Sequence, residues 1–246
     1  MELNGKKALL IGASRGIGEA IALDFADNGA DVVVCGRRAE TLRPVAEKIQ
    51  EKGRNAYTIE WDISDVTRAD GVMKEASELL GGLDIVVNNA GVMDYERFLH
   101  VREEGWDRVM NVNVKGVYFS CQAAANFFLE NNADREVKGR IINIASETGF
   151  QPSHMPYGIS KWGVVAYSMG MAKQLYKMGV MISSIAPGPI ATDMMGWSEG
   201  RPMDFPNAFG TLGSPEEVAD LAVFLASDKN RRIIGRPVFV SGGLDW

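Results

Sequence analysis

Two side chains that could together transfer a proton stand four residues apart in the stretch 155–161, MPYGISK. They are Tyr157 and Lys161, and the i and i+4 positions of a helix share one face. A free tyrosine has a pKa of about 10, and a nearby ammonium group lowers that pKa because it favours the phenolate. The pair therefore predicts a general acid or base that works near neutral pH, provided that other signals support it.

Two further polar residues could face the same crevice. Ser146 follows the apolar run 141–145, and open α/β sheets bind ligands beyond the carboxyl ends of their strands. Asn113 lies in a segment with helical periodicity that can carry its side chain toward that edge. The alternatives are Ser153, which falls in a predicted loop, and Asn111, which the spacing to the following glycine disfavours.

The elements that must position these residues alternate regularly along the chain. Short apolar runs rich in valine and isoleucine are separated by longer segments of helical periodicity. The runs are Ala8–Ile11, Val32–Cys35, Tyr57–Ile59, Ile85–Val87, Ile141–Ile144, Val180–Ile185 and Val238–Val240. They are apolar on both faces, as strands of a parallel sheet covered by helices must be. We therefore expect an α/β fold, a doubly wound parallel sheet (Rossmann fold) of about seven strands with helices on both faces.

The sequence predicts one domain over 1–246, because it contains no repeat, low-complexity tract or linker. Only the stretch 193–213 departs from the alternation, since it mixes Gly, Pro, Met and aromatic residues without a clear period. A loop of this length is usually functional, and we expect a substrate lid. The next helix is predicted to begin at Ser214, which with Glu217 has the pattern of a capping box.

A glycine-rich turn, 12–18 (GASRGIG), connects the first predicted strand to the helix predicted over 19–28. Gly12 allows a sharp turn, Gly16 lets the backbone approach a pyrophosphate, and Gly18 lets the helix pack close to the strand. The free N–H groups at the start of the helix would then face the phosphates of a dinucleotide. The other residues of the turn expected to contact it are Ser14, Arg15 and Ile17.

The order of these motifs resembles the short-chain dehydrogenase/reductase family in its compact single-domain form. The turn has the spacing G-x-x-x-G-x-G, and the stretch 88–91 (NNAG) follows the fourth predicted strand. The residues that match the family's Asn-Ser-Tyr-Lys tetrad then follow in order: Asn113, Ser146, Tyr157 and Lys161. The resemblance covers essentially the whole chain. Ile11 replaces the threonine usual before the first glycine, which removes a hydrogen bond between neighbouring strands rather than a cofactor contact.

The resemblance implies a hydride transfer between nicotinamide and a carbonyl or alcohol carbon. Tyr157 would give or take the proton on oxygen. Ser146 would polarise the carbonyl oxygen, Lys161 would hydrogen-bond the nicotinamide ribose, and Asn113 would hold a water that relays protons toward Lys161. No metal is expected.

The resemblance also places cofactor contacts after several predicted strands. Asp62 and Ile63 match the family's adenine contact. The stretch that lines the cofactor in the family corresponds here to Asn89, Ala90 and Gly91. The P-G-x-x-x-T motif, which in the family holds the nicotinamide carboxamide, supplies Pro187, Gly188, Ile190 and Thr192.

The residues after the second predicted strand favour NADP(H) over NAD(H). An acidic residue at this position would hold the ribose hydroxyls of NAD, but the chain has Gly36, Arg37 and Arg38 there. The guanidinium group of Arg37 could bind a 2′-phosphate, and Arg15 could approach the same phosphate from the glycine turn.

The substrate side of the predicted site is rich in methionine and aromatic residues, over the segments 93–98, 147–155 and 194–209. This composition indicates an adaptable apolar pocket for a bulky ketone or a hydroxysteroid-like secondary alcohol. The alternative substrate is a 3-oxoacyl-[acyl-carrier-protein], although Thr211 replaces an arginine expected in such reductases. The alternative class is a non-catalytic NADP-sensing Rossmann protein, which would typically have lost the tyrosine or the lysine. A sugar-nucleotide epimerase would need a longer substrate region.

The bulk properties exclude other classes. A net charge of −6 argues against nucleic acid as a partner. The N-terminal apolar run is too short for a signal peptide or a membrane span. The two cysteines, Cys35 and Cys121, have no metal-ligand spacing and fit a reducing cytoplasm. We therefore expect a cytoplasmic protein with a small carbonyl or alcohol substrate and no membrane partner. Relatives also imply a homo-oligomer, a tetramer or a dimer.

Overall fold

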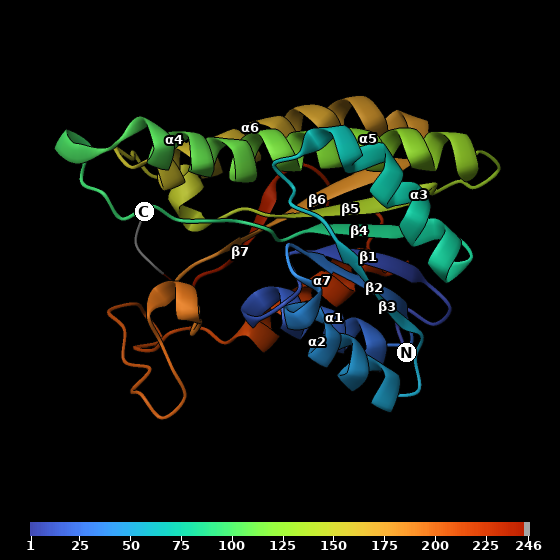
Figure 1. Ribbon diagram of the computed structural model, residues 1–246, viewed down its shortest axis with the longest axis horizontal. Helices are drawn as coiled ribbons and strands as arrows, with labels where there is room; N and C mark the ends of the chain where they lie inside the picture. Colours follow the sequence, from blue (N-terminus) through green and yellow to red (C-terminus); the bar gives the residue numbers. More distant parts are fainter. Residues whose placement is uncertain (244–246) are drawn as a thin grey trace.

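The computed structural model describes residues 1–243. Seven parallel strands form one sheet, as the sequence predicts, and their order is β3-β2-β1-β4-β5-β6-β7 (Figure 1). The strands are β1 (Lys7–Ile11), β2 (Asp31–Gly36), β3 (Ala56–Glu60), β4 (Ile85–Asn88), β5 (Gly139–Ile144), β6 (Val180–Pro187) and β7 (Pro237–Val240). Every predicted apolar run lies within one of these strands, so hydrophobicity on both faces is a reliable signal here.

Helices cover both faces of the sheet, which confirms the doubly wound architecture (Figure 1). One layer consists of α1 (Gly16–Asp27), α2 (Ala39–Glu51) and α7 (Pro215–Ala226). The other consists of α3 (Ala69–Leu80), α4 (Glu103–Met110), α5 (Val117–Asn131) and α6 (Pro156–Leu175). Helix α7 begins with the predicted capping box between Ser214 and Glu217.

The core is divided by the sheet into two halves. Successive side chains of a strand point to opposite faces, so Leu10 of β1 belongs to the apolar cluster that includes Phe25 of α1. Its neighbour Leu9 belongs to the cluster that includes Phe128 of α5. Both layers of helices are thus fixed to the same central strands, which gives the carboxyl ends of those strands a rigid support.

A buried hydrogen-bond network joins the central strands to the helices of one layer. Asn88, the last residue of β4, donates to Asn143 Oδ1 of β5 at 2.9 Å and accepts from Ser120 Oγ of α5 at 2.7 Å. Asn143 in turn donates to Ser168 Oγ of α6 at 2.9 Å. Because buried polar groups need partners, this network specifies how α5 and α6 sit on the sheet.

Strand order reverses at β1, which has β2 on one side and β4 on the other. Crossover connections leave in opposite directions at such a point and open a crevice at the carboxyl ends of the strands. The segment 193–213 follows β6 and contains a 3₁₀ turn, η6 (Asp193–Met195), and two isolated bridges, Ile190 to Gly213 and Asp204 to Thr211. The segment thus has few regular contacts of its own.

Candidate active site

A cavity of about 680 Å³ lies at the carboxyl ends of the strands, where the reversal of strand order opens the crevice. Most of the predicted site residues line it. From the first half of the chain these are Gly12, Ser14, Arg15, Gly16, Ile17, Arg37, Asp62, Ile63, Asn89, Ala90 and Gly91. From the second half they are Ser146, Tyr157, Lys161, Pro187, Gly188, Ile190 and Thr192. Residues far apart in the sequence therefore meet in one hollow of a size suited to a cofactor and a small substrate.

The glycine turn is packed so tightly that side chains would not fit in it. Gly12 has φ of 85°, and a Cβ atom there would stand 2.5 Å from the backbone nitrogen of Ala90. A Cβ atom on Gly18 would stand 2.1 Å from the carbonyl oxygen of Gly12, so Gly18 serves helix packing, although it does not line the cavity. Asn89 Nδ2 donates to the same carbonyl at 2.6 Å. The turn thus presents bare backbone and the start of α1 to the cavity, which fits a pyrophosphate group.

Tyr157 and Lys161 lie on the first turns of α6, where Lys161 is buried and Tyr157 is half-buried. Lys161 Nζ is 5.6 Å from the centre of the Tyr157 ring and donates a 2.8 Å hydrogen bond to the carbonyl oxygen of Ile144. Burial lowers the pKa of Lys161 to about 8, because the ammonium group is removed from water. The lysine is therefore a mostly charged group at neutral pH in an apolar setting.

The pKa of Tyr157 differs from the expectation drawn from the sequence. Burial raises it to about 12, and a hydrogen bond with Ser146 only partly opposes this. The negative charges of Tyr95 and Glu147, where ionised, act in the same direction as burial. The nearby ammonium alone does not lower the pKa of the phenol, because desolvation of a buried phenolate outweighs it. In the protein without ligands, Tyr157 is thus a protonated phenol.

Ser146 is the second residue after β5, and its side chain is buried against the cavity. Its Oγ accepts hydrogen bonds from the backbone N–H of Thr148 at 3.3 Å and from Thr148 Oγ1 at 3.0 Å, at the start of the 3₁₀ turn η4 (Glu147–Phe150). These bonds leave the serine O–H as a donor toward the cavity. Ser153 lies outside the cavity lining, and its Oγ contacts Met155.

Asn113 is held in a π-helical turn, η3 (Asn111–Gly116), between α4 and α5. Its Oδ1 accepts from the backbone N–H of Val92 at 2.8 Å, and its Nδ2 donates to the carbonyl oxygen of Val92 at 2.9 Å and to Ser160 Oγ at 3.0 Å. Asn113 is buried behind the cavity wall, whereas Asn111 is exposed. The side chain of Asn113 therefore joins the segment after β4 to α6.

The arginines of the predicted phosphate site occupy different surroundings. Arg15 and Arg37 line the cavity, and Arg15 forms a solvent-exposed ion pair with Asp193 at 3.1 Å. Arg38 lies outside the cavity lining and pairs with Glu40 at 3.7 Å. Two guanidinium groups can therefore approach a phosphate in the cavity, while the third stabilises the start of α2.

The substrate side contains some of the expected methionine and aromatic residues. Those that line the cavity are Met93, Met194, Met195 and Trp197. The phenol of Tyr95 donates to the carbonyl oxygen of Met194 at 2.5 Å and so joins the segment after β4 to the segment after β6. Phe150 packs instead on Phe239, with ring centres 4.8 Å apart. Phe209 is exposed on the surface.

One chemically distinctive residue was missed as a candidate. Glu147 is buried beside Ser146, lines the cavity, and has a pKa raised by burial to about 7. Its segment was predicted to face the substrate, but no role was predicted for the residue itself, because a glutamate is usually exposed. Its position directly after the serine at a strand end was the available signal.

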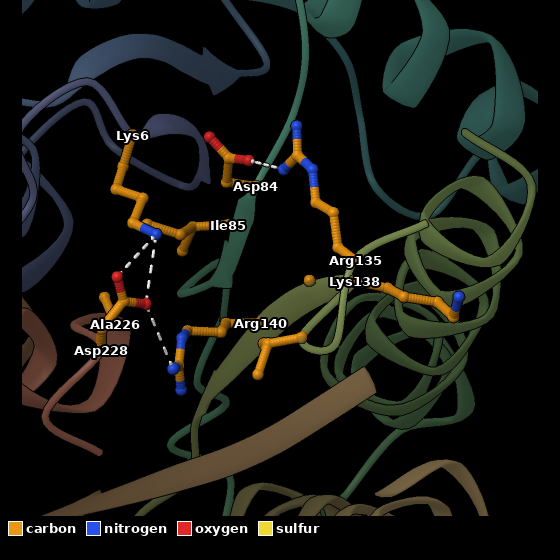
Figure 2. A pocket seen from close by; sticks show the side chains of 10 residues that line it. Lys6, Asp84, Ile85, Arg135, Lys138, Arg140, Ala226 and Asp228 are labelled. Atoms are coloured by element: carbon orange, nitrogen blue, oxygen red, sulfur yellow. Dashed lines mark hydrogen bonds and ion pairs between the residues drawn. The ribbon is translucent and has the colours of Figure 1, made fainter. Parts of the chain in front are cut away.

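A second, smaller cavity of about 250 Å³ lies at the opposite edge of the sheet, by the amino ends of β1, β4 and β5 (Figure 2). All of its charged side chains except Lys138, which donates to the carbonyl oxygen of Ala133, are in ion pairs. Asp228 contacts Lys6 at 3.1 Å and Arg140 at 3.6 Å, and Asp84 pairs with Arg135. None of the predicted site residues lies there, so this cavity is part of the support of the sheet.

Within residues 1–243, no cluster of histidine, cysteine, aspartate or glutamate side chains has the arrangement of a metal site. No helix in the same residues is both long and apolar enough to span a membrane.

The fold and the site together define a dinucleotide-binding protein with a half-buried tyrosine and a buried lysine in its crevice. The family described as short chain dehydrogenase matches residues 6–200. The chain belongs to this short-chain dehydrogenase/reductase family and is therefore an oxidoreductase.

Relatives match over almost their whole lengths. The 3-oxoacyl-[acyl-carrier-protein] reductase FabG of Aquifex aeolicus (strain VF5) is 33% identical over 250 residues, 99% of each chain. The (2S)-[(R)-hydroxy(phenyl)methyl]succinyl-CoA dehydrogenase subunit BbsD of Thauera aromatica is 32% identical and covers 99% of this chain and 98% of its own. Among solved structures, a short chain dehydrogenase from Burkholderia cenocepacia J2315 in complex with NADP is similar, with a TM-score of 0.87, 32% identity and 99% coverage of both chains.

Proposed function

We propose that the protein interconverts a ketone and a secondary alcohol with NADP(H), and that Tyr157 is its general acid and base. The observation that carries the proposal is one cavity in which Ser146, Tyr157 and Lys161 meet a glycine turn shaped for a pyrophosphate. A sensor protein that only binds a dinucleotide has no need for a half-buried phenol and a buried ammonium beside it, since each loses hydration there.

Each residue has a task that follows from its surroundings. The Ser146 hydroxyl donates a hydrogen bond to the substrate oxygen and so stabilises the negative charge that develops on it. Tyr157, protonated as described above, donates its proton to that oxygen in reduction and takes it back in oxidation. Bound NADP(H) supplies or accepts the hydride. The charged Lys161 stabilises the phenolate that forms after proton donation, and Asn113 positions the wall behind it.

The choice of NADP(H) is supported by the two arginines at the adenosine end of the cavity. Arg15 and Arg37 line it, and the chain has no acidic residue directly after β2. A guanidinium group binds a phosphate dianion through charge-assisted hydrogen bonds, whereas ribose hydroxyls are better held by a carboxylate. The neighbour from Burkholderia cenocepacia was solved with NADP, which agrees with this assignment.

The proposed substrate is a bulky apolar ketone or the corresponding alcohol. Methionine and tryptophan side chains from the segments after β4 and β6 line the cavity and form an adaptable apolar wall. The second candidate is a 3-oxoacyl-[acyl-carrier-protein], because relatives named for that activity are 33% and 34% identical to this chain.

We also propose a homo-oligomer that forms through α5 and α6. Both helices carry large apolar side chains exposed on the single chain: Tyr118 and Phe119 on α5, and Trp162 and Met169 on α6. Exposed apolar patches of this kind mark association surfaces. A cytoplasmic setting would keep the two buried free cysteines, Cys35 and Cys121, reduced.

The test is the loss of NADPH absorbance with a panel of a 3-oxoacyl thioester, oxo-steroids, oxo-bile acids and aryl ketones, with NADH in parallel. Turnover of a ketone with NADPH is the expected outcome, and the class that reacts identifies the substrate. Faster turnover with NADH would contradict the roles of Arg15 and Arg37. Tight NADPH binding without turnover of any carbonyl would favour the sensor.

A further inference from the structure

We propose that Glu147 selects the substrate: its carboxyl group binds a hydrogen-bond donor, a hydroxyl or an ammonium group, that the substrate carries next to the reacting carbon. The proposal rests on the carbonyl–alcohol activity proposed above and adds a polar requirement to an otherwise apolar pocket. It follows from the position of the residue, from its lack of a partner and from the charges around it.

The position of Glu147 places it next to the chemistry. It is the first residue after Ser146 and lines the same cavity as Tyr157 and Lys161. It also faces the residue directly after β6, since a Cβ atom on Gly188 would stand 3.1 Å from Glu147 Oε2. A substrate whose oxygen meets Ser146 and Tyr157 therefore has its neighbouring substituents within the surroundings of this carboxyl group.

Glu147 lacks the partner that a buried carboxyl group needs. Only 8% of its surface is exposed, and Oε2 is shielded from water without any hydrogen-bond partner among residues 1–243. Asp94 has the same exposed fraction, yet it accepts from Arg108 at 3.0 Å and from the backbone N–H of Glu96 at 2.9 Å. Buried polar groups are rarely left unsatisfied, so the missing donor points to a ligand.

Lys161, which lines the same cavity, does not supply this donor. Lys161 Nζ donates to the carbonyl oxygen of Ile144, and no ion pair joins it to Glu147 in the described part of the chain. The carboxyl group can be satisfied by a donor that enters the cavity. Rotation about its Cγ–Cδ bond is broad and roughly two-fold, so either oxygen can be presented to that donor.

The donor must be neutral or positive. A carboxylate accepts hydrogen bonds from O–H and N–H groups and repels anions. Burial raises the pKa of Glu147 to about 7, which shows that no nearby cation stabilises its charge before a ligand binds. A hydroxyl or an ammonium group therefore satisfies the ionised carboxylate of Glu147, which an ether oxygen or a carboxylate in the same place cannot do.

Three aryl ketones that differ only beside the carbonyl group test the proposal: α-hydroxyacetophenone, α-aminoacetophenone and α-methoxyacetophenone, each reduced with NADPH. The readout is the ratio of kcat/KM for each donor-bearing ketone to that for the methoxy ketone. The wild-type ratio is expected to exceed one, and Glu147→Gln is expected to lower it by about tenfold for the donor that the site prefers. If Glu147→Gln lowers the ratio for the amino ketone alone, the preferred group is an ammonium group. If it lowers the ratios for both the hydroxy and the amino ketone, the site accepts either a neutral or a charged hydrogen-bond donor.

The matched control is Glu47→Gln, which removes an exposed carboxylate on α2, outside the lining of the cavity. Its ratios are expected to stay within about twofold of the wild type. A structural role of Glu147 would lower all three values of kcat/KM together and leave the ratios unchanged, which would overturn the proposal. Ratios of one in the wild type would overturn it as well. Failure of the wild type to reduce any of the three ketones, with NADPH bound, would instead contradict the proposed function and remove the basis of this inference.

Discussion

The amino edge of the parallel sheet, where its strands begin, and the carboxyl edge, where they end, differ in whether buried charged groups have ion-pair partners. At the amino edge, the buried guanidinium of Arg140 contacts Asp228, and Asp84 contacts Arg135 (Figure 2). At the carboxyl edge, Lys161 and Glu147 have no ion-pair partner among residues 1–243, and Tyr157, whose ring centre is 5.6 Å from Lys161 Nζ, lines the same cavity. The buried guanidinium that supports the fold is paired, while the buried charged groups of the candidate active site are left without counter-ions. The presence of a cavity alone does not distinguish the candidate active site from the structural cavity at the amino edge. The ion pairing of the buried groups distinguishes them more clearly.

Removal of the phenol is expected to have the largest effect. Tyr157→Phe leaves the ring and its packing in place but removes the proton donor, so kcat should fall on the order of 10³-fold. NADPH binding, followed by fluorescence, should stay close to the wild-type value. Substantial turnover in this variant would show that the carboxyl edge is not the centre of proton transfer.

A smaller effect is expected where the cavity binds a charged part of the cofactor. Arg37→Ala should lower the preference for NADPH over NADH in kcat/KM by about 10- to 100-fold, because a charge-assisted contact to the 2′-phosphate is lost. Arg38→Ala is the matched control, since Arg38 pairs with Glu40 outside the cavity lining and should change the preference much less. Equal effects of the two variants would contradict this division of roles.

We expect the unpaired, buried ammonium group of Lys161 to lower the free energy of unfolding. Burial lowers the pKa of Lys161 to about 8 in the folded protein, so the unfolded chain binds its proton more tightly between pH 8 and its ordinary pKa of about 10.4. Below pH 8 the folded state bears the full free-energy cost of burying the ammonium group, and above about pH 10.4 this cost is absent because the amine is neutral in both states. Lys161→Met should therefore abolish activity yet raise the free energy of unfolding at pH 7 by about 1 to 3 kcal/mol.

Urea unfolding at several pH values checks this expectation. The advantage of Lys161→Met over the wild type should shrink as the pH rises from 8 to about 10. A variant that is less stable than the wild type at pH 7 would mean that the hydrogen bond to Ile144 outweighs the cost of burial.

The smallest effect is expected at the amino edge. Burial raises the pKa of Asp228, but Lys6 and Arg140 outweigh burial and lower it overall. Its pairing therefore stabilises the fold above the ordinary carboxyl pKa of about 3.9 and is lost as the pH falls through the lower folded pKa. Asp228→Asn should cost about 1 kcal/mol at pH 7, since Asp228 itself is largely exposed, and almost nothing near pH 2. A change in kcat without a change in stability would contradict the supporting role of this edge.

Much of this arrangement could be predicted because the sequence carries local signals for it. Runs such as Val180–Ile185 can only be strands covered on both faces, and the turn between β1 and α1 needs its glycines for reasons of space. The i and i+4 spacing placed Tyr157 and Lys161 on one helix face. These features depend on periodicity and sterics, which neighbouring residues determine.

Other features depend on what lies around a residue in three dimensions. The pKa of Tyr157 is raised rather than lowered because the surrounding protein desolvates it, and spacing carries no information on that. Arg37 and Arg38 are adjacent and identical in type, yet only Arg37 lines the cavity. Glu147 gained a candidate role only when its burial and its lack of a partner were seen.

The strand order affects when the candidate active site can form during folding. Leu10 pairs with Val34 early in the chain but with Val87 only after the whole β2–β3 excursion has been made. Contacts between distant segments form slowly, because the loop between them must close first. The glycine turn, the tyrosine helix and the strand β6 therefore come together late, when nearly all of the sheet has assembled. A chain that ends before Pro187 lacks residues of the active-site cavity, so we expect no turnover before β6 and the segment after it have been made.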